Sequence, residues 1–413
     1  MNSYLKKYGF QSPKILEVPS ADLGIIVVIP CHNETKTVLS LESLKKCEKP
    51  KCAVKTILVI NQSEVVTKEI SVQNENTYKE VMFWKTTNLD FDLEVIFEKS
   101  LPKKHAGVGL ARKIGMDEAV HVFHQIDEDG IIVALDSDCT VDANYLKEIE
   151  SHFHVNFKTP GCSIRYAHPL EGNKFEKEIY SGITNYELHL RYYNQALEFC
   201  KLPYAFHTVG SSMAVKSSAY QKQGGMNKRK AGEDFYFLQK IIELGNFTEL
   251  NSTCVIPSPR ISDRVPFGTG KAIGDWVEAN NVTYFTYNFT SFIELKKLVE
   301  DIPRIYESDI YQSNSPCIQG FIKSINFENK IAEIKKNTTN YSNFTKRFFT
   351  FFNAFTVLKF VHFARDNYYP NLSVTEESKK LLTQVFHYDN ENNTNKELLH
   401  LFREIEKSDF LGN

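Results

Sequence analysis

Two carboxylates directly follow an apolar run near the middle of the chain. Residues 131–135 read Ile-Ile-Val-Ala-Leu, and Asp136 and Asp138 come next, separated by one serine. Mg²⁺ and Mn²⁺ accept carboxylate oxygens, and a bound diphosphate can complete the coordination shell around two aspartates. An isolated Asp-x-Asp more often caps a helix or solvates a turn, so a metal role depends on the residues that accompany the pair.

A second acid pair, Glu233 and Asp234, precedes an apolar helical pattern over 235–238. Acids at a helix N-terminus stabilise the helix by about 0.3 to 1 kcal/mol, which is the structural explanation. The chemical one is that a carboxylate near an acceptor hydroxyl takes its proton as that oxygen attacks. Three cations, at 228–230, come just before these acids.

Two further segments have residues suited to binding anions. Residues 104–115 are basic and rich in small side chains, and Arg112 there could hold a phosphate; a glycine-containing helix entry packed on a strand would read the same. Residues 259–270 are dense in cations and glycine, and Arg260 or Arg264 could neutralise a leaving diphosphate in a loop that closes over it. An ordinary salt-bridged turn is the alternative.

The elements that must position these residues alternate along the first 160 residues. Apolar runs rich in Ile and Val alternate with amphipathic segments, a pattern typical of a mostly parallel sheet with helices on its faces. Ligands of such sheets bind at the carboxyl ends of the strands. The expected strands are 24–30, 56–61, 93–98 and 131–135, and the expected helices are 37–46 and 110–123.

The second half of the chain becomes helical. A long amphipathic stretch covers 179–200, and beyond 280 the chain is rich in Lys, Glu, Asn and Phe at helical spacing, with an exposed loop expected at 389–395. We divide the chain into a domain over 1–280 and a helical C-terminal extension over 281–413. The apolar stretch 348–363 is shorter than the roughly 20 residues that a membrane span needs. It predicts one buried helix, with a membrane-surface or partner-binding face as the alternative.

Taken in order, these motifs resemble the family 2 glycosyltransferases of GT-A fold, over roughly residues 24–245. The matching motifs are Asn33-Glu34 after a strand, Ala111-Arg112 within 107–115, Asp136-Ser137-Asp138, Gly210, Gly224-Gly225-Met226 and Glu233-Asp234. The resemblance implies an α/β fold: a GT-A sheet, mixed and mostly parallel, flanked by helices and followed by the helical extension. It also implies a nucleotide-sugar donor, inversion at the anomeric carbon, and Mn²⁺ or Mg²⁺ as cofactor.

Site residues follow from the same resemblance. Asp138 would bind the metal together with Asp136, and Asp234 would be the general base, with Glu233 beside it. The resemblance places Pro30 and Glu34 against the nucleotide and Asp136 near the ribose or the metal. The other expected donor contacts are Asn61, Arg112, Arg260 and Arg264. Two positions depart from the family pattern: Asn61 stands where an acidic residue usually faces the nucleobase, and Lys113 takes the place of an Asn after Ala-Arg. The Gln-x-x-Arg-Trp box of processive synthases is absent, which favours a transferase of the hexosyltransferase class that adds single sugars.

Composition limits the alternatives. The 413 residues contain 49 Lys+Arg and 51 Asp+Glu, a net charge of −2 that disfavours a nucleic-acid binder. Eight cysteines without a C-x-x-C pair, and a start without an apolar region, predict reduced thiols and a cytoplasmic protein, with peripheral membrane contact left open. The expected partners are a nucleotide-sugar donor and a carbohydrate or lipid-linked acceptor. The alternatives are a sugar-phosphate nucleotidylyltransferase, a non-catalytic sugar- or nucleotide-binding module, and a retaining transferase of the same fold.

Overall fold

The structure is a computed structural model that describes residues 2–264, 268–279 and 283–408. The chain divides into two compact units. Met1–Pro169 and His207–Lys271 form the first, called here the sheet unit, and Leu170–Phe206 and Ala272–Asn413 form the second, called the helical unit. The two are described separately, and a domain boundary at 280 stays a prediction.

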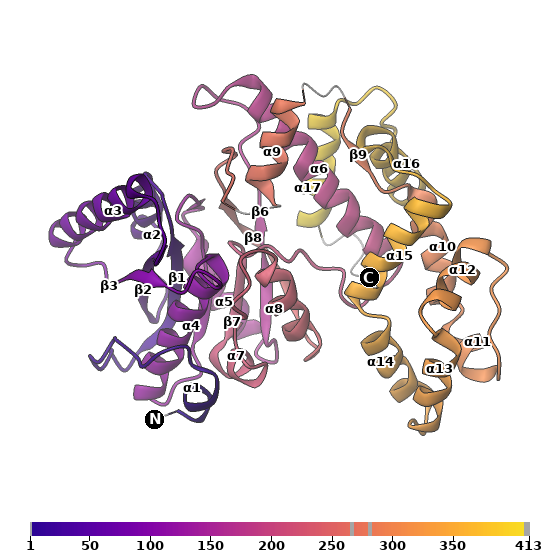
Figure 1. Cartoon of the computed structure of the whole chain (residues 1–413), viewed down its shortest axis with the longest axis horizontal. Coiled ribbons are helices and arrows are strands. Elements are labelled where there is room, and N and C mark those ends of the chain that lie inside the picture. Colours follow the sequence, from indigo (N-terminus) through magenta and orange to yellow (C-terminus); the bar gives the residue numbers. More distant parts are fainter. Residues whose placement is uncertain (1, 265–267, 280–282, 409–413) are drawn as a thin grey trace. The chain divides into compact units, whose positions relative to one another are not determined.

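One mixed sheet of 8 strands forms the centre of the sheet unit in the described residues, in the order β3-β2-β1-β4-β7-β6-β8-β5 (Figure 1). β1 pairs in parallel with β2 and β4, β2 with β3, and β6 with β8, whereas β7 runs antiparallel to β4 and β6, and β5 to β8. This sheet, with its flanking helices and the helical C-terminal region, confirms the expected fold class. The strands are β1 Leu23–Cys31, β2 Ala53–Ser63, β3 Leu93–Leu101, β4 Ile131–Ala134, β5 Thr140–Val141, β6 Gly161–Tyr166, β7 Met213–Lys216 and β8 Thr248–Ile256.

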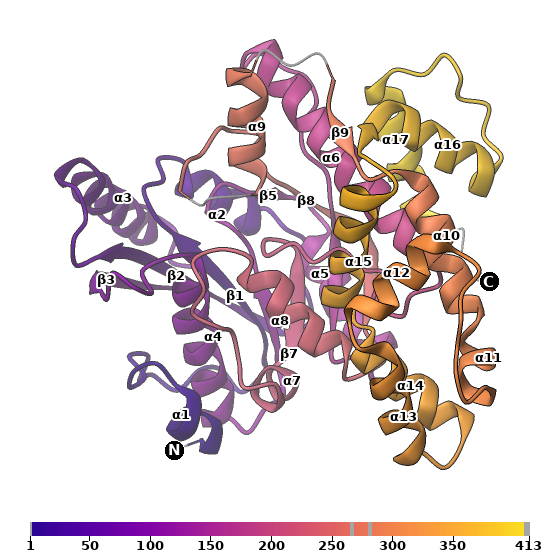
Figure 2. The same ribbon diagram turned by 45° about the vertical axis from the view of Figure 1, so that its right-hand side comes forward.

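Helices cover both faces of this sheet (Figures 1 and 2). Alternate residues of β1, such as Ile25 and Val27, join the buried cluster that includes Leu41 of α2 and Val81 of α3. On the opposite face Gly115 of α4 lies against β1 and β2, and a Cβ at that position would stand 3.1 Å from Val59 Cγ2. The helices of this unit are α1 Ser3–Tyr8, α2 Thr37–Lys45, α3 Lys68–Thr87, α4 Val108–Gln125, α5 Tyr145–Val155, α7 Ser217–Lys222 and α8 Glu233–Ile242.

The helical unit consists of helices and one two-stranded sheet, β9-β10, which the sequence did not predict. Its first helix, α6, covers Lys177–Phe199, close to the expected 179–200. The other elements of this part of the chain are α9 Thr269–Glu278, which begins at the end of the sheet unit, β9 Phe285–Thr286, α10 Phe289–Glu300, α11 Ile302–Glu307, α12 Pro316–Ser324, α13 Phe327–Lys336, α14 Tyr341–Phe351, α15 Ala354–Asn367, β10 Leu372–Ser373, α16 Val374–Phe386 and α17 Asn395–Lys407.

The expectation of one helix over 348–363 is wrong. α14 ends at Phe351 and α15 begins at Ala354, because the Asn353 side chain accepts hydrogen bonds from the amides of Phe355 and Thr356 and so caps a new helix. The expected burial is found at several phenylalanines, namely Phe348, Phe352 and Phe360. None of the helices in the described parts of the chain is long and apolar enough to cross a membrane.

A buried ionic network joins the two ends of the helical unit. Arg191 of α6 is fully buried, and its Nε lies 2.8 Å from Glu187, one turn away. Arg191 also pairs with Glu406 of α17, and Arg403 of α17 donates to both oxygens of Glu187 at 2.8 Å. Because removing one partner would leave a buried charge unpaired, this network anchors the last helix to α6.

The cysteines agree with the expected thiols. All eight are free, and seven of them are buried, with Cys52 half-buried. Burial raises the pKa of the Cys31 thiol to about 11, so this thiol stays protonated near neutral pH.

Candidate functional site

Parallel pairing brings the ends of β1 and β4 to one edge of the sheet. The amide of Leu135, just after β4, donates to the Val28 carbonyl of β1 at 3.1 Å, so Asp136 and Asp138 emerge beside the loop that carries Glu34. Asn33 in that loop adopts a left-handed φ of 50°, which asparagine tolerates better than most residues. Parallel pairing therefore places these residues at the carboxyl ends of neighbouring strands.

Arg112 of α4 joins the two acid pairs. Its Nη2 lies 2.5 Å from Asp136 Oδ1, and its Nη1 pairs with Glu233 Oε1. The guanidinium is buried against Gly210, where a Cβ would stand 2.6 Å from Arg112 Cζ. Only glycine at 210 leaves the space that this bridge occupies.

Asp234 is held by the backbone. Its Oδ2 accepts a hydrogen bond from the Gly210 amide at 2.9 Å, and its Oδ1 accepts one from the Phe235 amide at 2.8 Å. Burial raises the pKa of Asp234, while the charge of Arg112 and the two amide bonds oppose that rise. Burial likewise raises the pKa of Glu233 to about 7, again opposed by Arg112 and reinforced by Asp234. Arg112 thus pairs with two carboxylates and its charge also acts on Asp234, while burial opposes the ionisation of Glu233 and Asp234.

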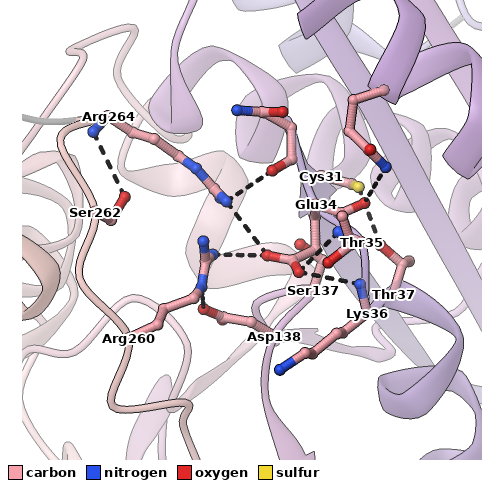
Figure 3. Close-up of polar contacts among 12 residues, drawn as sticks. Cys31, Glu34, Thr35, Lys36, Thr37, Ser137, Asp138, Arg260, Ser262 and Arg264 are labelled. Carbon is pink, nitrogen blue, oxygen red and sulfur yellow. Dashed lines mark hydrogen bonds and ion pairs between the residues drawn. The ribbon is translucent and has the colours of Figure 1, made fainter. Parts of the chain in front are cut away.

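Four side chains form a second ionic cluster (Figure 3). Arg260 places its Nε 2.7 Å from Asp138 Oδ2 and its Nη2 2.7 Å from Glu34 Oε2. Arg264 lies 3.4 Å from the same Glu34 oxygen and donates to the Asn33 carbonyl at 2.8 Å. The other oxygen of Glu34 accepts the amides of Thr35 and Lys36 at 2.9 and 3.1 Å. The segment 258–264 is therefore tied to the ends of β1 and β4, and residues 265–267 of the loop expected over 259–270 lie outside the described residues.

The charges of this cluster balance. Burial alone would lower the pKa of Arg260, but Asp138 and Glu34 outweigh it and the pKa is raised. For Arg264, burial and the neighbouring Arg260 lower the pKa, and the carboxylates of Glu34 and Asp138 offset this only in part. Arg260 is thus the more firmly held of the two cations.

The aspartate pair offers oxygen ligands to a cation. The Asp136 and Asp138 side chains are 36% and 19% exposed, and each pairs with an arginine through one oxygen, leaving Asp136 Oδ2 and Asp138 Oδ1 without a cationic partner among the described residues. The same residues contain no group of three or more His, Cys, Asp or Glu suited to hold a metal. This donor set fits a hard divalent cation that takes its remaining ligands from a diphosphate and water.

Two of the expected donor contacts lie deeper in the sheet. Pro30 is buried in β1, and the Asn61 side chain of β2 is also buried, while the Asn61 carbonyl is 2.7 Å from His32 Nδ1 and also accepts from Asn74. His32 and Asn74 were not singled out in the sequence; they hold the loop after β1, since Asn74 Oδ1 also accepts the Asn33 amide at 2.8 Å.

Lys113, the departure from Ala-Arg-Asn, points away from both acid pairs. Its Nζ donates to Tyr4 Oη at 3.1 Å and lies 3.0 Å from Asp117. Tyr4 and Tyr220 both donate to Asp117, at 2.8 and 2.9 Å. Lys113 therefore helps to anchor the N-terminal helix α1 on α4.

No family model matches the chain, and no curated protein matches its sequence. Solved structures similar to it include S. aureus TarS 1-349 in complex with UDP-GlcNAc, at 14% identity and a TM-score of 0.40, covering 95% of this chain and 93% of that one. Another is mannosyltransferase PcManGT from Pyrobaculum calidifontis in complex with GDP-Man and Mn²⁺, at 14% identity and a TM-score of 0.39, covering 98% and 91%. GalNAc-T7 with UDP, GalNAc and Mn²⁺ aligns at 15% identity and a TM-score of 0.39, covering 75% and 57%. Superpositions this loose leave the function to be argued from this chain's own residues.

Proposed function

We infer that this chain transfers a sugar from a nucleoside diphosphate sugar to an acceptor hydroxyl, with inversion at the anomeric carbon. The observation that carries the proposal is the bridge of Arg112 between Asp136 and Glu233. It ties a carboxylate pair suited to a metal-bound diphosphate to a carboxylate, Asp234, suited to take a proton. A transfer of this kind needs both functions within one site.

The donor end is formed by Asp136, Asp138, Arg260 and Arg264. A divalent cation bound by the two aspartates would supply positive charge to the diphosphate as the sugar departs. Arg260 and Arg264 add two further cations, and charge placed where negative charge develops is usually the largest catalytic contribution. In this proposal Arg260 leaves Asp138 and binds the diphosphate when the donor binds, because one guanidinium cannot pair fully with both.

The acceptor end is formed by Asp234. Its two amide bonds fix the carboxylate and hold it ready to accept the proton that the attacking hydroxyl loses. Its raised pKa also makes it a stronger base than an exposed aspartate. Glu233 is a positioning residue, because it acts through Arg112.

The experiment that tests this function is a thermal-shift screen of UDP, GDP, dTDP and CMP sugars, each with and without Mn²⁺. A ligand that binds only the folded chain raises its melting temperature. We expect one nucleotide class to raise it in a Mn²⁺-dependent way, and the anomeric configuration of the product, read by NMR, then tests inversion. If no nucleotide sugar shifts the melting temperature with either Mn²⁺ or Mg²⁺, the proposed donor class is wrong.

A further inference from the structure

A run of three cations precedes the second acid pair and has no role in the function proposed so far. Lys228, Arg229 and Lys230 are all exposed, and Lys104, before α4, is exposed as well. In the described part of the chain none of these four side chains forms an ion pair. A chain with a net charge of −2 therefore concentrates unneutralised positive charge at one loop.

The loop is fixed in place by the side chain of Asn227. Asn227 Nδ2 donates to the Glu233 carbonyl at 3.0 Å, and Asn227 Oδ1 accepts the Arg229 amide at 3.0 Å. Two glycines of the α4 entry allow the close approach: a Cβ at Gly107 would stand 3.1 Å from Lys230 Cα, and one at Gly109 would stand 3.0 Å from Glu233 Cβ. Substituents at either position would push the loop away from α4.

Two of these cations lie over aromatic rings and form no ion pair with an acid among the described residues. Arg229 Cζ lies 3.9 Å from the centre of the Tyr236 ring, and Lys228 Nζ lies 5.7 Å from that of Phe10. A ring orients a cation without neutralising it, so the charge stays available to a ligand.

The place of this loop in the chain indicates which of the two substrates its charges would contact. Loop and general base belong to the same segment, since Asn227 bonds to the residue next to Asp234. The cations assigned to the donor, Arg260 and Arg264, lie instead on the segment that contacts Asp138 and Glu34. The loop thus carries a set of positive charges separate from those assigned to the donor, and it is tied to the residue beside the proposed base.

We propose that the acceptor is anionic, and that Lys228, Arg229 and Lys230, with Lys104, bind phosphate or carboxylate groups near its attacking hydroxyl. The proposal rests on the transferase function above and names the substrate class of its acceptor end. Complementary charge would raise the rate of encounter and favour charged acceptors over neutral ones, and salt would weaken both effects.

Binding of fluorescent inorganic polyphosphate tests the charge recognition directly. The variant replaces Lys228, Arg229 and Lys230 by Gln, and its matched control replaces Lys323, Lys346 and Arg347 by Gln, three exposed cations without ion pairs in the described helical unit. We expect the first variant to bind about tenfold more weakly, with a smaller dependence on salt, and the control to stay close to the wild type. Equal losses in both variants would overturn the site.

Two further arms separate this site from its neighbours. UDP or GDP with Mn²⁺ should stabilise the triple variant as much as the wild type; loss of that shift would assign the loop to the donor and overturn the proposal. Vesicles of phosphatidylglycerol are compared with vesicles of phosphatidylcholine, and binding of the loop to anionic vesicles but not to polyphosphate would indicate a membrane surface and not an acceptor.

Turnover then tests the acceptor itself. The wild type is offered oligosaccharides with and without a phosphate ester, and the charged form should give the higher kcat/KM, with the advantage lost in the triple variant. Equal kcat/KM for both forms would contradict an anionic acceptor. Polyphosphate binding without any sugar transfer would instead mean that the transferase function had failed while the anion site stood.

Discussion

Arg260 lies 2.7 Å from Asp138, so a guanidinium occupies one oxygen of the carboxylate that the proposed cation needs. The same arginine binds Glu34 at the end of β1. In this state the loop before α9 and the strand ends are held together by charge. Donor binding has to rearrange that contact. Replacing Arg260 should therefore change the affinity for the cation and the affinity for the nucleotide in different ways.

Removing this arginine should affect the cation and the nucleotide in opposite directions. In Arg260→Ala, Asp138 loses its competing partner, and Mn²⁺ alone should bind about two- to fivefold more tightly, the scale of a partly exposed ion pair. The nucleoside diphosphate should bind more weakly, because one cation near its phosphates is gone. Calorimetric titration measures both.

The matched control for Arg260→Ala is Arg264→Ala. Arg264 contacts Glu34 and the Asn33 carbonyl but not Asp138, so its removal should leave the affinity for Mn²⁺ unchanged. Equal tightening in both variants would mean that Arg260 does not compete for Asp138.

Replacing the base should separate turnover from binding. Asp234→Asn keeps the shape of the side chain and its place beside Gly210, but it cannot accept the acceptor proton. Turnover should fall by about 10² to 10⁴, while donor binding stays close to normal. Unchanged turnover would exclude Asp234 as the base.

The pH dependence of kcat/KM should shift when the charge of Arg112 is removed. The raised pKa of Asp234 sets the acid limb of kcat/KM, because only the ionised carboxylate accepts a proton. Arg112 lowers that pKa, so Arg112→Gln should raise it and move the acid limb to higher pH. Lys240→Gln, an exposed change on the same helix, should leave the limb where it is. A limb that moves to lower pH in Arg112→Gln would contradict the assignment.

Space at Gly210 is needed by the bridge. Gly210→Ala places a methyl group against the Arg112 guanidinium, and overpacking of this kind costs about 1 to 3 kcal/mol. Urea unfolding measures the free energy. In a double-mutant cycle with Arg112→Ala the cost should largely vanish, because the clashing group is gone. Additive costs would mean that Gly210 is needed for another reason.

The strands near the site could be predicted because they are long apolar runs. β1, β2 and β4 fall within about three residues of the expected ranges, since their burial on both faces leaves a clear signal. β9 and β10 have two residues each and leave no such signal. The break between α14 and α15 was missed because one capping asparagine outweighs an otherwise continuous apolar pattern.

The candidate site could be predicted only in part. The acids at 136, 138, 233 and 234 stand out because each pair lies at the boundary of an element. The sequence could not predict that Arg112 connects the two pairs. Arg112 and Glu233 are 121 positions apart in the chain, and their contact depends on how α4 packs on the sheet. The contacts of Arg260 depend in the same way on the position of one loop.

The central claim is that a cation bound by Asp136 and Asp138 holds the donor diphosphate. Calorimetric titration of the wild type and of Asp138→Ala with the nucleotide found in the screen, with and without Mn²⁺, tests it most directly. We predict that Mn²⁺ strengthens nucleotide binding in the wild type and has no such effect in Asp138→Ala. The same Mn²⁺ enhancement in both proteins would contradict the account.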